Sequence, residues 1–124
     1  MRLTWLEPPF SVCRLPARAA IPAWSAQPGA FFCVVRTTDE LSIVCEQRLV
    51  PAGVQAEGPF LALKVAGPLH FSLVGVLASL LDPIAQAGIS VFVVSTFDTD
   101  YLLVSTVDRD SATKVLIAAG HSVE

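Results

Sequence analysis

The strongest constraint on the fold is the pattern of apolar residues between positions 60 and 123. The segment "PFLALKVAG" alternates apolar and polar side chains, as a strand does. A helix is expected next, with Ser72 as its N-cap, Gly88 at C′, and Pro83 causing a bend but not an end. Its apolar stripe has helical spacing and comprises Val74, Leu77, Leu80, Leu81 and Ile84.

The remainder of this region predicts two strands, a second helix and a last short strand. "ISVFVVS" and "DYLLVS" are the strand pair, and "HSVE" supplies the last strand. Asp108 or Asp110 caps the second helix and Gly120 ends it, around a stripe of Ala112, Val115, Leu116 and Ala119. The order β-α-β-β-α-β predicts an α+β, ferredoxin-like fold, a four-stranded antiparallel sheet with both helices on one face.

The N-terminal half reads as a shortened copy of the same plan. Residues 9–29 are rich in Pro and Gly and predict irregular structure with one turn near residues 22–26. "FFCVVRTTDELSIV" lies over "VFVVSTFDTDYLLV" at an offset of 60 residues, which pairs Glu40 with Asp100. We therefore predict a duplication, with a reduced βαββ half that lacks its second helix at residues 1–58 and a full half at residues 59–124.

The composition bounds the class of protein. Hydrophobic residues make up 53% and charged residues 15%, with a mean hydropathy of +0.63, yet the longest apolar run, "LVGVLASLL", is too short to span a membrane. We therefore expect a soluble chain, without membrane contact, that buries apolar surface in a subunit interface. A net charge of −3 without a basic cluster argues against nucleic acid.

The three cysteines, Cys13, Cys33 and Cys45, have no metal-ligand spacing. They are expected to be buried, reduced thiols of a cytoplasmic protein, with a metal or redox role as the alternative. The N-terminal stretch lacks the apolar segment of a signal peptide, which agrees with a cytoplasmic location.

Three motifs resemble the ACT domain family: "GPLHFSLVGV" at 67–76, "AGIS" at 87–90 and "STFDTDYLLV" at 95–104. "FSVCRLP", "IPAW" and "RTTDELSIVC" are similar to the companion half of small bacterial tandem-ACT proteins related to the CASTOR arginine sensors of animals. This resemblance covers nearly the whole chain. Those sensors have acidic residues where this sequence has Ser72 and Leu73, so arginine does not carry over as the ligand.

The resemblance implies a regulatory module that binds an amino acid where the first strand runs into the first helix, facing an edge strand of a partner ACT unit. Related modules pair side by side into an eight-stranded sheet. The loop residues that carry over are His70, Phe71, Ser72, Leu73, Val74, Gly75 and Val76. The hairpin residues are Thr96, Phe97 and Asp100, and the facing strand would supply Ser90, Val91 and Phe92.

Two of these residues have a clear chemical rationale for binding an amino acid. Gly75 opens a helix whose N-terminal N–H groups attract a carboxylate, and it lets the ligand approach closely. Asp100 offers a carboxylate to the ammonium group or to a basic side chain. The alternatives are that Gly75 serves only helix–sheet packing and that Asp100 only caps its turn.

The other candidates have ordinary structural explanations as well. Thr96 is either a ligand contact or a β-branched strand residue, and His70 has the sequence context of a surface loop. Phe97 fits a pocket wall or a dimer contact. Asp98 lies at the turn tip, where solvation is expected.

Catalysis finds no support in the sequence. His70 and His121 have no nucleophile arranged beside them, and no metal-ligand spacing occurs, so we expect neither an enzyme nor a cofactor. The leading hypothesis is a cytoplasmic homodimer of tandem ACT units that binds a free amino acid and signals to an unknown protein partner. The alternatives are a ligand-free dimerisation or interaction module, and the subunit of an enzyme whose catalytic chain is separate.

Overall fold

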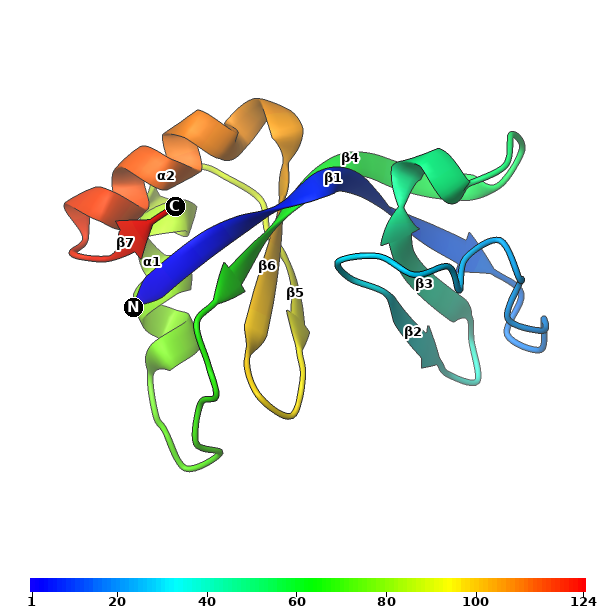
Figure 1. Ribbon diagram of the computed structural model, residues 1–124, viewed down its shortest axis with the longest axis horizontal. Coiled ribbons are helices and arrows are strands. Elements are labelled where there is room, and N and C mark those ends of the chain that lie inside the picture. The colour runs from blue at the N-terminus through cyan, green and yellow to red at the C-terminus, as the bar shows by residue number, and fades with distance from the viewer. The chain divides into compact units, whose positions relative to one another are not determined.

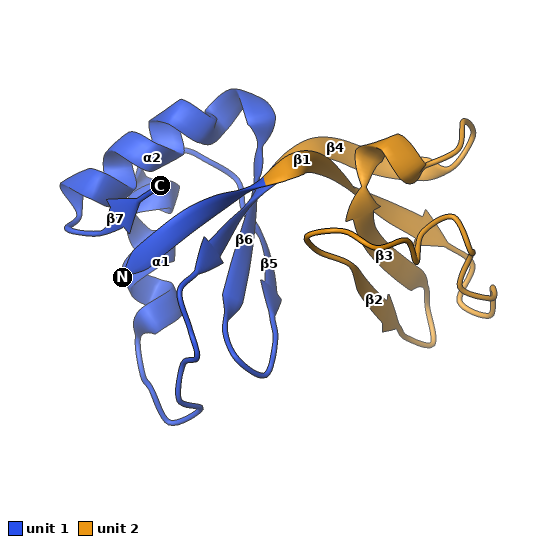
Figure 2. Ribbon diagram, in the orientation of Figure 1, with its two compact units in different colours: residues 1–6, 61–124 blue, residues 7–60 orange.

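The computed structural model describes residues 1–124 and divides into two compact units (Figure 1). Unit 1 comprises Met1–Leu6 and Leu61–Glu124, and unit 2 comprises Glu7–Phe60 (Figure 2). Two long strands, β1 (Arg2–Leu15) and β4 (Gln55–Val65), contribute residues to both units. This division differs from the predicted one because the first six residues belong with the C-terminal part of the chain.

Unit 1 has the predicted β-α-β-β-α-β order and confirms the α+β, ferredoxin-like fold class. After β4 come α1 (Val76–Gln86), β5 (Phe92–Ser95), β6 (Asp100–Ser105), the 3₁₀ turn η2 (Thr106–Asp108), α2 (Arg109–Ala118) and β7 (Ser122–Val123). Asp108 holds the N-cap position of α2 without a side-chain capping bond. Neither α-helix has the length and hydrophobicity needed to cross a bilayer.

The sheet of unit 1 contains one strand more than predicted. Its order is β7-β1-β4-β6-β5, so the N-terminal part of β1 lies between β7 and β4. β7 runs parallel to β1, with Arg2 opposite Ser122, whereas the β5–β6 pair is antiparallel as predicted. Leu3 and Trp5 explain the insertion, because their alternating side chains are 1% and 9% exposed within the core.

The core of unit 1 lies between the sheet and its two helices. It joins apolar residues from every layer: Leu3, Trp5, Leu61, Leu63, Val65, Leu80, Ile84, Ile89, Leu102, Val104, Ala112 and Leu116. The indole Nε1 of Trp5 donates a hydrogen bond to Thr113 Oγ1 at 3.0 Å, which satisfies its polar group. The predicted stripes supply the buried faces of both helices, except that Ala119 and Val74 are exposed.

Helix α1 begins later than predicted. Its N-cap is Gly75, which has φ +81°, so the prediction that Ser72 caps the helix and that Val74 lies on its buried stripe is wrong. Val74 is instead 94% exposed. The predicted C-terminus is confirmed: Gly88 has φ +74°, and Ile89 N–H donates to the Ile84 carbonyl at 3.2 Å, the pattern of a Schellman motif.

The proline inside α1 does not end the helix. Pro83 has no N–H, so the carbonyl of Ser79 lacks its helical donor. His121 Nε2 lies 3.2 Å from that carbonyl and donates to it from beyond the end of α2. A residue distant in sequence thus satisfies the group that the proline leaves unpaired.

Unit 2 has a sheet but no α-helix. Its strands β2 (Cys33–Arg36) and β3 (Leu41–Glu46) confirm the predicted hairpin and lead into the turn η1 (Gln47–Leu49). The strand order is β2-β3-β1-β4. Two predictions are wrong here: residues 9–15 are strand, not irregular, and both helices are missing, not only the second. Phe10, fully buried and edge-on to Phe31, explains why the first of these segments is ordered.

The register of the two hairpins corrects the predicted repeat. Arg36 pairs with Leu41 at the end of one hairpin, and Ser95 pairs with Asp100 at the end of the other. The equivalent positions are therefore 59 residues apart, from 36 to 95, and η1 and η2 follow at the same offset. The counterpart of Asp100 is Leu41, not Glu40.

All three cysteines are free, and the core of unit 2 contains two of them. Cys13 and Cys45 are each 1% exposed and their thiols share a hydrogen bond. Burial raises the pKa of all three thiols, and that of Cys45 reaches about 11 from its ordinary value of 9.0. These thiols are poor nucleophiles at neutral pH, because the thiolate is the reactive form.

The raised pKa of Cys45 predicts a loss of stability at alkaline pH. The unfolded thiol ionises near pH 9 and the folded one only near pH 11, so its contribution is full below pH 9 and is lost as the pH rises. This difference between the folded and the unfolded pKa of Cys45 corresponds to a loss on the order of 2 kcal/mol in the free energy of unfolding. Urea unfolding at pH 8 and pH 10.5 should show a smaller pH effect in Cys45→Ala; an equal effect in both proteins would contradict this origin.

Candidate functional site

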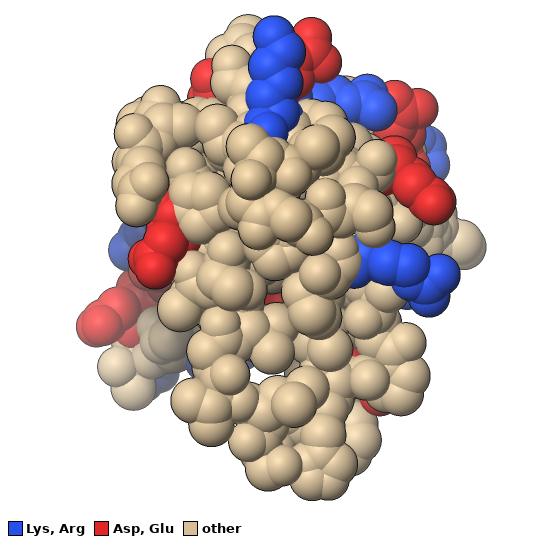
Figure 3. Space-filling model, turned by 90° about the vertical axis from the view of Figure 1, so that its left-hand side faces the viewer, with Lys and Arg blue, Asp and Glu red and all other residues tan.

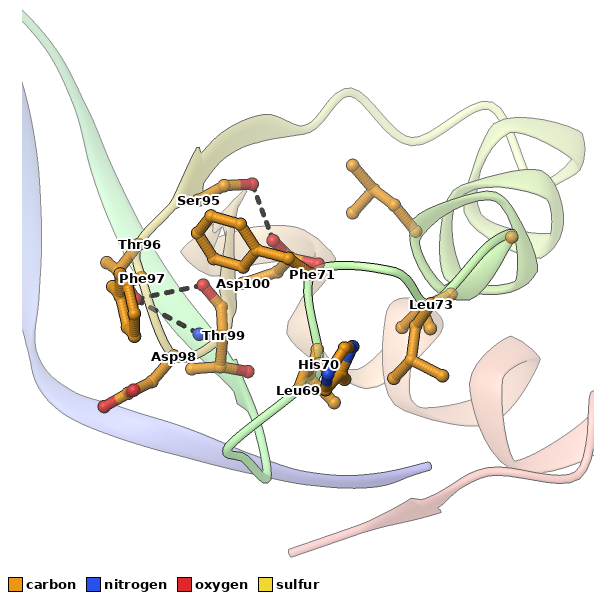
Figure 4. Close-up of a pocket in the computed structure, with 13 residues that line it drawn as sticks. Leu69, His70, Phe71, Leu73, Ser95, Thr96, Phe97, Asp98, Thr99 and Asp100 are labelled. Atoms are coloured by element: carbon orange, nitrogen blue, oxygen red, sulfur yellow. Dashed lines mark hydrogen bonds between the residues drawn. The ribbon is translucent and has the colours of Figure 1, made fainter.

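A pocket of about 350 Å³ lies in unit 1 between the segment that enters α1 and the tip of the β5–β6 hairpin (Figure 4). Eight of the predicted site residues line it: His70, Phe71, Leu73, Gly75, Val76, Thr96, Phe97 and Asp100. Five lining residues were not predicted: Leu69, Leu77, Ser95, Asp98 and Thr99. Ser72, Val74, Ser90, Val91 and Phe92 do not line this pocket.

The hairpin wall is shaped by a threonine, not by an acid. Thr96 N–H donates to the Thr99 carbonyl at 2.8 Å, and Thr96 Oγ1 accepts from Thr99 N–H at 3.2 Å. In unit 2, Thr37 makes the same bonds to Glu40, at 2.9 Å and 3.1 Å. The conformation of the turn is therefore common to both units and does not require Asp100.

Two hydrogen bonds join this hairpin to the segment after β4. Leu69 N–H donates to the Asp98 carbonyl at 2.6 Å, and the buried Thr99 Oγ1 donates to the Val65 carbonyl at 2.6 Å. Gly67 permits this approach, because a Cβ there would lie 3.0 Å from the Asp98 oxygen. The two walls of the pocket are thus held together at its base.

Asp100 is the acid that faces the pocket. Ser95 Oγ donates to its Oδ1 at 2.6 Å across the hairpin, as Figure 4 shows, and no other hydrogen bond or ion pair involves the carboxylate. Leu41 occupies the equivalent position in unit 2. Asp100 is therefore specific to unit 1, and the idea that it belongs to a repeated acidic turn is wrong.

The N-terminus of α1 forms the opposite side of the pocket. Ser79 N–H, bonded to the Gly75 carbonyl at 3.0 Å, is the first donor of the helix with an acceptor in the chain. The N–H groups of Val76, Leu77 and Ala78 precede it, and neither a capping side chain nor an acidic residue in the first turn engages them. The space beside Gly75 is open, since no atom lies within 4 Å of an added Cβ.

Two further polar residues, His70 and Asp98, line the pocket. The His70 ring is hydrogen-bonded within its own loop, and the Asp98 carboxylate points away (Figure 4). His70 Nδ1 accepts from Ser72 N–H at 3.2 Å and lies 2.6 Å from Ser72 Oγ. The Asp98 carboxylate is directed away from Phe71 and Asp100 in Figure 4. No lysine or arginine lines the pocket, and no cluster of three metal-ligating side chains occurs in the chain.

An exposed aromatic pair stands at the pocket. Phe71 and Phe97 come from opposite walls, and their ring centroids are 5.1 Å apart at an interplanar angle of 49°. They remain 76% and 80% exposed, unusual values for large apolar side chains. This pair is a contact surface without a partner in the single chain.

Unit 2 closes the corresponding gap with its own side chains. Arg36 stands where unit 1 has Ser95 and donates to the carbonyls of Ala17 and Ala19, the latter at 2.9 Å. Arg14 donates to the Asp39 carbonyl at 3.2 Å, on the equivalent of Asp98. The open pocket between loop and hairpin is therefore a feature of unit 1.

The buried bond from Thr99 predicts which threonine matters most for stability. Thr99→Val leaves the Val65 carbonyl without its donor and should lower the free energy of unfolding by about 1–3 kcal/mol, whereas Thr99→Ser keeps the hydroxyl and should cost less. Thr38→Val, in the exposed turn of unit 2, is the matched control and should be nearly neutral. Equal effects of Thr99→Val and Thr38→Val in denaturant unfolding would refute this role.

Comparisons with known proteins agree with this geometry. A family model of the ACT domain matches residues 55–118, and a model of another family's N-terminal domain matches residues 9–53. No curated protein matches the sequence.

Among solved structures, a protein from Agobacterium tumefaciens is 41% identical, covers 99% of this chain and 91% of its own, and has a TM-score of 0.92. A Vibrio cholerae protein of unknown function, described as a possible transport protein, is 18% identical with a TM-score of 0.73, over 94% of this chain and 89% of its own. An allosteric aspartate kinase from Clostridium acetobutylicum is 11% identical with a TM-score of 0.68, and the match spans 94% of this chain but 34% of the kinase.

The last two likenesses concern the fold alone. The family match instead covers the strand, loop, helices and hairpin that build the pocket. ACT domains are regulatory domains that generally bind amino acids. The protein belongs to the ACT domain family.

Proposed function

We propose that this protein is a regulatory module that binds a free amino acid in the unit 1 pocket. One observation carries the proposal: a single acid and a free helix N-terminus face one pocket of about 350 Å³. That volume is within the range of small-molecule sites. The two groups have opposite polarity, as the main chain of an amino acid requires.

The N-terminus of α1 is the proposed site for the ligand carboxylate. The unpaired N–H groups of Val76, Leu77 and Ala78 carry the positive end of the helix dipole. Gly75 leaves the approach open, since a side chain there would stand in the free space beside the helix. A carboxylate at this position would complete hydrogen bonds that the chain itself leaves unmade.

Asp100 is the proposed partner of the ligand ammonium group. Ser95 engages one carboxylate oxygen and orients the group, which leaves the second oxygen to accept from a ligand. Bonds between ammonium and carboxylate are charge-assisted and are among the stronger hydrogen bonds in proteins. Phe71, Leu73, Thr96 and Phe97 would enclose the remainder of the molecule.

We propose further that two copies of the chain form a cytoplasmic homodimer that signals to a protein partner. β5 is the edge strand of unit 1, and Phe92 on it is 39% exposed. In such a dimer, Ser90, Val91 and Phe92 of one copy would face the pocket of the other. Unit 2 would be the reduced half of a duplicated ACT unit. Sedimentation velocity should give twice the chain mass; a monomer at micromolar concentration would oppose this arrangement.

The alternative is a ligand-free interaction module of the same fold. The exposure of Phe71, Val74 and Phe97 favours it, because large apolar patches often mark protein interfaces. It predicts that no amino acid changes the thermal stability of the protein. A thermal shift screen with all common amino acids at millimolar concentration separates the two functions.

Asp100→Asn provides the sharpest test of the binding mode. Removal of the charge should weaken amino acid binding by about 10- to 100-fold, as expected for the loss of 1.5–3 kcal/mol from a charge-assisted bond. Titration calorimetry measures this with the best ligand from the screen. Asp39→Asn, in the turn of unit 2, is the matched control and should bind like the wild type.

Two results would contradict the proposed site. The first is a ligand whose affinity is the same for wild type and Asp100→Asn. The second is equal weakening by Asp100→Asn and Asp39→Asn, which would show an effect of net charge and not of position.

A further inference from the structure

We infer that the pocket selects amino acids with an uncharged, apolar side chain. This inference rests on the proposed function and names the class of ligand for the same site. The charged groups that face the pocket match the carboxylate and the ammonium group of an amino acid main chain. Each acidic or basic ligand carries one charge more than the pocket can neutralise.

The main chain of the ligand uses the charged groups that the pocket provides. The α1 N-terminus serves the carboxylate and Asp100 serves the ammonium group. An acidic side chain would need a cation, but no lysine or arginine lines the pocket, and His70 is engaged with Ser72. A basic side chain would need a second acid, yet the Asp98 carboxylate points away from the Phe71 side of the pocket (Figure 4).

The remaining lining suits an apolar side chain. Leu69, Phe71, Leu73, Leu77 and Phe97 contribute hydrocarbon surface from both walls. Phe71, Leu73 and Phe97 are 76%, 54% and 80% exposed, so a bound side chain would remove apolar surface from water on the protein as well as on the ligand. Burial of apolar surface on both partners gives a gain that a charged side chain forfeits.

The face of unit 1 that Figure 3 shows has an uneven distribution of charge. In Figure 3 the charged side chains lie mainly near the top and the margins of this face, and its lower part is almost uncharged. The loop of residues 66–75 lies at that lower end (Figure 1). A charged ligand side chain that extended past the loop towards this lower part would meet little complementary charge (Figure 3), whereas Lys64 and Asp98 line an adjoining hollow on the hairpin side.

Titration calorimetry on the full chain tests the inference with ligands of matched size. Norleucine, lysine and glutamate share an unbranched side chain and differ in its charge. Norleucine should bind at least tenfold more tightly than lysine or glutamate. Lysine or glutamate binding as tightly as norleucine would overturn the inference while leaving the proposed amino acid site intact.

A variant locates the apolar contact. Phe97→Ala should weaken norleucine binding about tenfold and leave the binding of alanine, whose methyl side chain offers little apolar surface, nearly unchanged. Val107→Ala removes another exposed apolar side chain, 85% exposed and outside the pocket lining, and should alter neither. Equal weakening of norleucine and alanine by Phe97→Ala would overturn the inference. Failure of every amino acid to bind the wild type would overturn the proposed function as well.

Discussion

The pocket depends on the hydrogen bond from Thr99 Oγ1 to the carbonyl of Val65, 2.6 Å long and buried. That bond fixes the hairpin tip to the end of β4, and the bond from Leu69 N–H to Asp98 continues the attachment into the loop. The two bonds tie the hairpin that bears Asp100 to the segment that leads into α1. Attachment of this kind would lower the entropy cost of ordering the pocket when the proposed ligand binds.

The hairpins of the two units share their turn conformation but differ in the residues at their base. Both turns are closed by a threonine hydroxyl, Thr37 in unit 2 and Thr96 in unit 1. They differ at the base of the hairpin, where unit 2 has Arg36 and Leu41 and unit 1 has Ser95 and Asp100. Arg36 uses its guanidinium to bind the chain's own carbonyls, whereas the smaller Ser95 leaves room for a ligand and orients the acid.

Sequence periodicity was sufficient for the order of elements in unit 1, because its strands and helices carry distinct apolar repeats. It failed where tertiary contacts decide. The insertion of β1 between β4 and β7 depends on the packing of Leu3 and Trp5 against a core whose other members lie between Leu61 and Leu116. Ser72 has the chemistry of an N-cap but bonds to His70 instead. The offset of 60 pairs Phe32 with Phe92 and Val44 with Val104, but the observed offset of 59 pairs Thr37 with Thr96 and Asp39 with Asp98. The turn residues therefore carried the signal for the true register, which the apolar residues alone did not reveal. No sequence pattern indicated that Ser95 bonds to Asp100 or that Thr99 bonds to the Val65 carbonyl.

The proposed function requires that an amino acid bind between Asp100 and the N-terminus of α1. The most direct measurement is an amide-resolved NMR titration of the full chain with norleucine. Binding at this site should give saturable shifts at the backbone amides of Val76, Leu77 and Ala78 and in the hairpin at 95–100, with the turn at 37–40 unchanged. Shifts confined to the turn at 37–40, or no saturable shift at the start of α1, would contradict it.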